Sequence, residues 1–197
     1  AEQLKADGIE LDVMLSADGV PVVIHDSTVD RTTNGHGRVS EMTLAQLQAL
    51  DAGSYKGPSF AGEPIPTLEA VLDACGSLRI NIELKSPTTR DDGLEAAVAA
   101  LVEARRLGPN IIISSFNPLS LWHMRHIAPN LRRALLYSPD LPIYLRRAWS
   151  APLLGLDAVH PHFTLVNEAY MRWARRKGYH VNVWTVNDPA EVVRLLD

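Results

Sequence analysis

The sequence predicts an α/β fold in which parallel β-strands alternate with helices. Apolar runs of strand length recur along the chain, helical segments lie between most of them, and several of these segments begin with a capping residue or a proline. Six strands connected in this way fit an open parallel sheet poorly. They fit a (β/α)8 or TIM barrel of about 250 residues that lacks its first βα unit and its last strand. This incomplete barrel is our prediction.

The strands are predicted from apolar alternation and from turn signals at their ends. The second strand is an added hairpin partner of the first, because Asp18-Gly19 is a turn signal between the two. The predicted strands are 8–14, 20–25, 79–85, 110–115, 132–137, 156–160 and 180–186.

The helices are predicted from local start and stop signals. The longest helix is expected over about 92–107 and should stop at Gly108. The stretch 26–66 is rich in Gly, Thr, Ser and Pro and should form a surface excursion with one short helix. The start signals are Thr43 with Gln46, Thr67, Asn117 before Pro118, and Asp188 before Pro189.

Composition places the chain among ordinary soluble domains. Its 197 residues are 46% hydrophobic and 21% charged, which fits one domain over 1–197 with a small insertion at about 26–66. A net charge of -4 and scattered Arg-Arg pairs disfavour a nucleic-acid partner. No apolar run approaches the ~18 residues of a membrane span. We expect a cytoplasmic protein by default, with a removed signal peptide as the open alternative, and the oligomeric state stays open.

Acidic side chains occupy one face of two predicted strands. In the first strand Glu10 and Asp12 share a face, and in the third strand Glu83 and Lys85 do so. Strand ends meet at the carboxyl-terminal mouth of a barrel, so the three carboxylates should converge there. Carboxylate oxygens are ligands for Mg²⁺ or Ca²⁺. With Lys85 beside it, such an ion would suit a phosphodiester.

Histidine 25 is the expected proton-transfer group of this site, because histidine titrates near neutral pH. Asp26 is expected to serve only the local backbone. Taken alone, Glu10 and Asp12 fit a solvent-facing strand edge better than a ligand pair. The second set of polar side chains, at 81–85, makes the ligand role of Glu10 and Asp12 the favoured interpretation.

Several motifs together resemble the glycerophosphodiester phosphodiesterase family. They are GIELDVMLSADGVPVVIHDSTVDRTTNGHGRVSEMTLAQLQALDAG, GEPIPTLEAVL, INIELKSP, SSFNP and VNVWTVND, in that order over nearly the whole chain. The resemblance implies a metal-dependent barrel acting in glycerophosphodiester, lipid and glycerol metabolism. It implies metal ligation by Glu10, Asp12 and Glu83, catalysis by His25 as one of two histidines, phosphate contact by Lys85, and support or lining of the site by Arg31 and Trp184.

The sequence departs from the family pattern at both ends. The first-strand His-Arg-Gly motif, which would supply the other histidine, does not precede Ala1, and the closing Thr-Asp-x-Pro segment does not follow Asp197. We expect hydrolysis of a small-molecule glycerophosphodiester to sn-glycerol 3-phosphate and an alcohol. The alternatives are a non-catalytic phosphodiester-binding barrel and, more weakly, a barrel glycosidase with paired carboxylates.

Two aromatic positions and one apolar segment admit two interpretations. Phe116 and Trp184 are core residues in most folds, but near barrel strand ends they can shape the substrate-binding mouth. The segment 144–156, YLRRAWSAPLLGL, could touch lipid through an apolar face. Ordinary packing is the expectation there.

Overall fold

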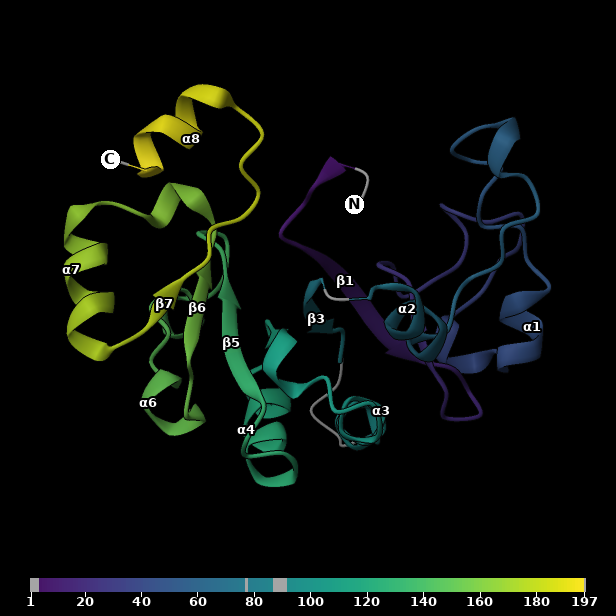
Figure 1. The fold of residues 1–197 in the computed structure, drawn as a ribbon, viewed down its shortest axis with the longest axis horizontal. Coiled ribbons are helices and arrows are strands. Elements are labelled where there is room, and N and C mark those ends of the chain that lie inside the picture. The colour runs from purple at the N-terminus through teal and green to yellow at the C-terminus, as the bar shows by residue number, and fades with distance from the viewer. Residues whose placement is uncertain (1–3, 77, 87–91, 197) are drawn as a thin grey trace. The chain divides into compact units, whose positions relative to one another are not determined.

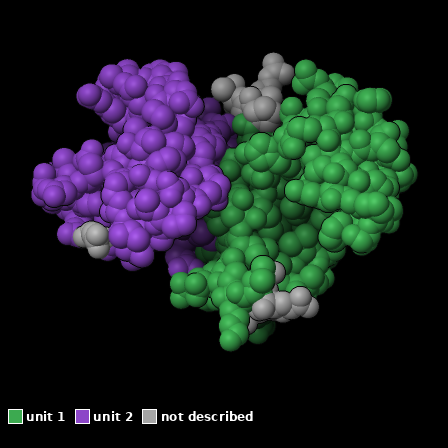
Figure 2. Space-filling view, turned by 90° about the horizontal axis from the view of Figure 1, so that it is seen from above, with its two compact units in different colours: residues 1–111 green, residues 112–197 purple. Residues whose placement is uncertain are grey.

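A computed structural model describes residues 4–76, 78–86 and 92–196. These residues form the alternating strands and helices predicted from the sequence (Figure 1). The chain divides into two compact units, residues 1–111 and 112–197, which are described separately (Figure 2). Within the described ranges, no helix is both long enough and apolar enough to cross a membrane.

Three strands pair with one another among the residues described in the first unit. β1 (Gly8–Leu15) lies between β2 (Pro21–Val23), to which it is antiparallel, and β3 (Arg79–Leu84), to which it is parallel. The N–H of Ile24 donates to the carbonyl of Asp12 at 3.0 Å, so the chain stays beside β1 after β2 ends. The three predicted strands are therefore confirmed, although β2 is shorter than predicted.

Apolar alternation decides which face of β1 is buried. Leu11 and Val13 are buried, whereas Glu10 and Asp12, which alternate with them along the strand, are not. This is the pattern expected when one face of a strand packs against helices and the other carries polar side chains.

Helices of the first unit begin where the sequence predicts. At α1, Thr43 and Gln46 form the predicted capping box, and at α2 the Thr67 side chain accepts from the Ala70 N–H. The helices are α1 (Leu44–Gln48), α2 (Leu68–Ala74) and α3 (Leu94–Ala104), with 3-10 turns η2 (Val39–Glu41), η3 (Pro58–Phe60) and η4 (Gly108–Asn110).

Helix α3 ends earlier than predicted. It closes at Ala104 instead of near residue 107, because Arg106 adopts a left-handed backbone with φ 54°. The Leu107 N–H then donates to the Val102 carbonyl at 3.2 Å, a helix-ending bond that usually needs glycine at the left-handed position. Gly108 instead opens η4.

The excursion 26–66 has a small core of its own. Its side chains Val29, Val39, Leu47 and Ile65 pack with residues from the β2 region in one buried cluster. Gly53 is required inside the excursion, because a Cβ there would lie 1.8 Å from the Phe60 carbonyl oxygen. The excursion therefore forms a packed wall beside β2.

In the part of the second unit that the structure describes, four parallel strands pair in the order β4-β5-β6-β7, and the first of them starts at Ile111, the last residue of the first unit. Its helices α4 and α7 begin with the side-chain caps Asn117 and Asn167. The strands are β4 (Ile111–Ser115), β5 (Arg132–Tyr137), β6 (Ala158–Pro161) and β7 (His180–Val181). The helices are α4 (Pro118–Ile127), α5 (Ile143–Arg146), α6 (Ala151–Leu154), α7 (Glu168–Lys177) and α8 (Pro189–Leu196), with the 3-10 turn η5 (Phe163–Leu165).

The prediction of a strand over 180–186 is wrong in length. Only two residues form β7, and pairing resumes as a single bridge between His162 and Trp184. The Asn182 N–H still donates to the Val159 carbonyl at 3.1 Å. The next ladder bond would need a backbone N–H at residue 161 of β6, and Pro161 has none.

Candidate active site

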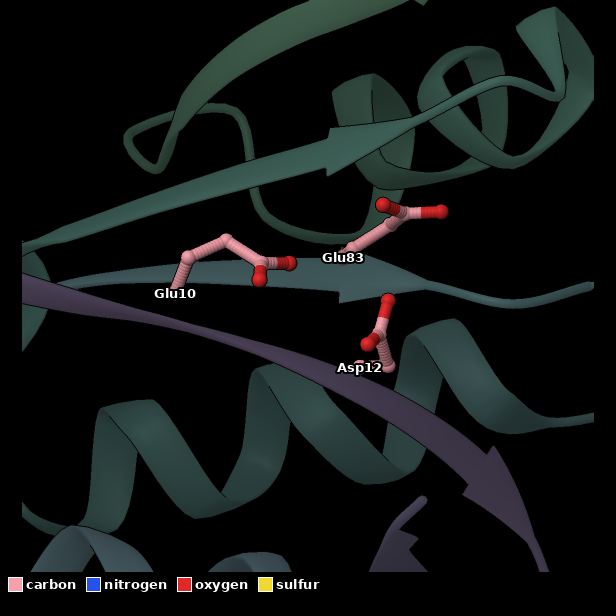
Figure 3. Close-up of side chains that lie close together, drawn as sticks. All are labelled: Glu10, Asp12 and Glu83. Atoms are coloured by element: carbon pink, nitrogen blue, oxygen red, sulfur yellow. The ribbon is translucent and has the colours of Figure 1, made fainter. Parts of the chain in front are cut away.

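Three carboxylates from β1 and β3 lie close together in the first unit (Figure 3). The parallel register places Asp12 beside Glu83, and Glu10 comes two residues earlier on the same face of β1. One oxygen of each carboxylate lies within 4.8 Å of the others. The convergence predicted from strand alternation is therefore present. We call these three residues the acidic cluster.

Lys85 is ion-paired with the acidic cluster. Its Nζ lies 3.1 Å from Asp12 Oδ1 and 2.7 Å from Glu83 Oε1. The backbone helps to place it, because the Lys85 N–H extends the ladder by donating to the Val13 carbonyl at 3.0 Å. One ammonium thus offsets part of the charge of three carboxylates.

The surplus negative charge is reflected in the pKa values of the cluster. Partial burial of the carboxyl group, followed by repulsion from Asp12 and Glu83, raises the pKa of Glu10 to about 7. The residue as a whole is still solvent-exposed. Burial also raises the pKa of Glu83, against the opposing effect of Lys85. For Lys85, burial lowers the pKa, but Glu83 and Asp12 outweigh it and the net shift is upward.

These residues fit a hard divalent cation. Mg²⁺ and Ca²⁺ prefer carboxylate oxygens, and no described cysteine is part of the cluster. Three carboxylates, one ammonium and one divalent cation sum to no net charge, so the ion would remove the repulsion that raises the Glu10 pKa. The cluster can therefore hold a divalent metal.

His25 follows β2 and is oriented by Asp26, which is itself held by Arg31. Its Nδ1 lies 2.6 Å from Asp26 Oδ1, and the Arg31 guanidinium donates to both Asp26 oxygens at 2.6 and 3.1 Å. The Arg31 bond, followed by the His25 bond, holds the pKa of Asp26 well below its usual range. An ionised carboxylate accepts only, so Nδ1 carries the proton and Nε2 is left for chemistry.

Asp26 is thus a residue whose role was predicted wrongly. We expected it to serve the local backbone, whereas the structure pairs it with the side chains of His25 and Arg31. Asp26 and Arg31 are oppositely charged and five residues apart in the sequence. This spacing brings the two side chains together only if the loop between them turns back on itself.

A cavity of about 370 Å³ joins the acidic cluster to the excursion. Glu10, Asp12, His25 and Arg31 border it, so four of the predicted site residues face one space. The remaining lining is Leu11, Val23, Ile24, Thr32, Ala52, Tyr55, Pro64, Ile65 and Pro66. The excursion therefore supplies one wall of the candidate site.

Asn81 adds a polar group beside the cluster that we had not assigned a role. It lies opposite Glu10 in the parallel register, and its Oδ1 is buried without a hydrogen-bond partner among the described residues. Burying an unpaired amide oxygen is costly, so its presence on this face is consistent with a polar site there.

The remaining predicted residues lie in the second unit. Phe116 and Trp184 contact each other edge to face with ring centroids 5.5 Å apart, and Trp184 Nε1 donates to the His160 carbonyl at 2.8 Å. Burial lowers the pKa of His160 to about 4, so this side chain is neutral at physiological pH. Phe116 and Trp184 form one aromatic contact, and their role in substrate binding stays a prediction.

Comparison with known proteins gives a consistent result. The model of the glycerophosphoryl diester phosphodiesterase family matches residues 1–197. A glycerophosphodiester phosphodiesterase of Caldanaerobacter subterraneus is 38% identical over 199 residues, covering 100% of this chain and 80% of that protein.

Solved structures match over nearly the whole chain. That of glycerophosphodiester phosphodiesterase from Agrobacterium tumefaciens has a TM-score of 0.80 at 34% identity, covering 98% of this chain and 80% of its own. An Oleispira antarctica phosphodiesterase in complex with the product sn-glycerol-3-phosphate has a TM-score of 0.86 at 29% identity, with coverages of 98% and 78%. These matches confirm the predicted α/β barrel class.

Proposed function

The chain belongs to the glycerophosphoryl diester phosphodiesterase family, and we propose that it hydrolyses glycerophosphodiesters at the acidic cluster. The products are sn-glycerol 3-phosphate and an alcohol, and the reaction is metal-dependent. The observation that carries this proposal is the approach of three carboxylate oxygens within 4.8 Å, with two of the carboxylates and His25 bordering one cavity.

The acidic cluster is assigned to metal binding. Glu10, Asp12 and Glu83 would hold the ion, which would supply charge neutralisation at the phosphate and activation of a bound oxygen nucleophile. We propose Mg²⁺ or Ca²⁺, since the donor set contains only oxygen. Lys85 holds Asp12 and Glu83 in place and is close enough to the cluster to meet a phosphate oxygen.

His25 is assigned to proton transfer. With Nδ1 bonded to Asp26, Nε2 is the atom that takes a proton from the attacking oxygen or gives one to the leaving alkoxide. Arg31 keeps Asp26 ionised and in position, so Arg31 supports the site through Asp26. During hydrolysis one P–O ester bond breaks, water supplies the new P–O bond, and its proton ends on the alcohol.

Other parts of the proposal concern the substrate site, the domain organisation and the location of the protein. Phe116 and Trp184 are proposed to line the substrate site, on the basis of their mutual contact near strand ends. A single domain over 1–197 is proposed because the family model matches that whole range. We also propose a cytoplasmic location by default. The net charge of -4 supports the proposal that the chain has no nucleic-acid partner.

The direct test is release of sn-glycerol 3-phosphate from glycerophosphocholine and glycerophosphoethanolamine, measured with a coupled dehydrogenase. We expect turnover that EDTA abolishes and that added Mg²⁺ or Ca²⁺ restores, because the carboxylates need the ion to hold the phosphate. Turnover that survives complete chelation would contradict the proposal. Calorimetry that shows diester binding without any product would favour the non-catalytic binder instead.

A further inference from the structure

The helices α5 and α6 and the turn between them, residues 147–150, expose apolar side chains that the catalytic proposal does not use. The inward side chains Ala148, Ala151 and Leu154 are buried in the core of the second unit. By contrast, Trp149 and Leu153 are 61% and 67% exposed, and Ile143 and Tyr144 are exposed as well. A single exposed apolar residue is normal, but four within one short segment indicate a binding surface.

A cavity of about 250 Å³ opens beside these helices, and residues of α7 form part of its lining. Its walls are aromatic, with Trp149, Trp173 and Tyr179, and two cationic side chains, Arg147 and Lys177, border it. Trp173 and Tyr179 lie with ring centroids 5.7 Å apart and pack on the core, so this side of the cavity is fixed.

The charge around this surface is opposite to that of the whole chain. Segments 141–156 and 169–187 contain six Arg and Lys and no Asp or Glu, in a chain of net charge -4. Each flanking acid has a partner. Glu168 pairs with Arg172 at 3.2 Å, and the other three accept hydrogen bonds: Asp140 from the Ser138 hydroxyl at 3.5 Å, Asp157 from the Arg133 N–H at 3.0 Å and Asp188 from the Ala190 N–H at 2.9 Å. In the described part of the chain, neither Arg147 nor Lys177 has an ion-pair partner.

We propose that this surface docks the protein onto an anionic phospholipid bilayer. We call Ile143, Tyr144, Arg147, Trp149, Leu153 and Lys177 the docking patch. Trp and Tyr favour the level of the lipid headgroups, aliphatic side chains enter the acyl boundary, and each nearby Lys or Arg gains attraction from anionic lipid. This combination of exposed aromatic, aliphatic and unpaired basic groups fits a lipid surface.

Vesicle flotation tests the docking patch. The 197-residue chain is mixed with vesicles of phosphatidylcholine alone or of phosphatidylcholine with phosphatidylglycerol. We expect binding to the anionic vesicles only, reduced by high salt, and weakened at least about fivefold by Lys177→Glu, which removes one attraction and adds a repulsion. Arg38→Glu, an exposed charge reversal in the first unit, is the matched control and should leave binding unchanged.

Tryptophan fluorescence gives an independent measurement. Anionic vesicles should shift the emission to shorter wavelength in the wild type and in Trp122→Phe, which changes an exposed tryptophan on α4, but not in Trp149→Phe. The proposal is overturned if no vesicle is bound, if neutral vesicles bind equally well, or if Lys177→Glu binds like the wild type. Vesicle-independent dimerisation lost in Trp149→Phe would assign the surface to self-association and also overturn it.

Discussion

At the scale of single residues, the pairing of Asp26 with His25 and Arg31 is the contact with the most direct consequence for catalysis. It fixes the protonated nitrogen of His25 and gives the imidazolium form an anionic partner. Asp26 does not contact the reacting atoms in this account, so it acts as a positioning residue.

We expect Asp26→Asn to lower kcat by about 10- to 100-fold, a part of what general acid–base catalysis contributes, while KM changes little. The pH–rate profile should change as well, because protonated His25 loses its partner. Asp26→Glu should recover part of the rate. A purely structural role would instead lower thermal stability and leave the pH–rate profile unchanged.

Glu10 gives a pH dependence of stability in the metal-free protein. Its pKa is about 7 in the folded chain and near 4.5 when unfolded, so the folded state binds the proton more tightly. Stability should therefore fall as pH rises from about 4.5 to about 7. Because Glu10 is partly exposed, we expect a loss of about 1 kcal/mol after solvent screening.

Urea denaturation in EDTA at several pH values measures this loss. Glu10→Gln should flatten the decline, and so should saturating Mg²⁺ or Ca²⁺, which favours the ionised carboxylate. An identical decline in Glu10→Gln would assign the effect to another group.

The residue-level predictions succeeded where strand alternation alone decides the geometry. Glu10, Asp12 and Glu83 follow from the two-residue period, since side chains two apart share a face and parallel neighbours come into register. The pairing of Asp26 with Arg31 could not be predicted in this way, because it depends on a loop returning on itself.

At the scale of elements, helix starts were predicted better than helix and strand ends. A cap such as Thr43 is a local side-chain contact that four residues specify. The end of α3 depends on a left-handed arginine, and the shortness of β7 depends on a proline in its neighbour β6. Neither signal lies within the pattern that defines the element itself.

The cap of α1 provides a stability test for the excursion. Thr43→Ala removes the hydroxyl that accepts from the Gln46 N–H and should reduce the free energy of unfolding by about 1 kcal/mol. Thr43→Ser keeps the hydroxyl and serves as the control in the same urea titration. Equal losses in both variants would mean that the methyl group, and not the cap, is responsible.

At the scale of the whole molecule, the α/β barrel class was predictable because alternation of strands and helices repeats along most of the chain. The division into two compact units was not predicted, since the sequence shows no composition shift near residue 111. For segment 144–156, lipid contact was considered but ordinary packing was expected. The basic side chains of the docking patch, Arg147 and Lys177, are far apart in sequence and border one cavity only in the fold.

The central claim is that Glu10, Asp12 and Glu83 together hold one divalent cation, and calorimetric titration with Mg²⁺ and Ca²⁺ tests it most directly. We expect one ion per wild-type chain. Glu83→Gln should lose that binding with its fold retained by circular dichroism, whereas Glu41→Gln, an exposed acid on the excursion, should bind normally. Undiminished binding of the ion by folded Glu83→Gln protein would contradict the account.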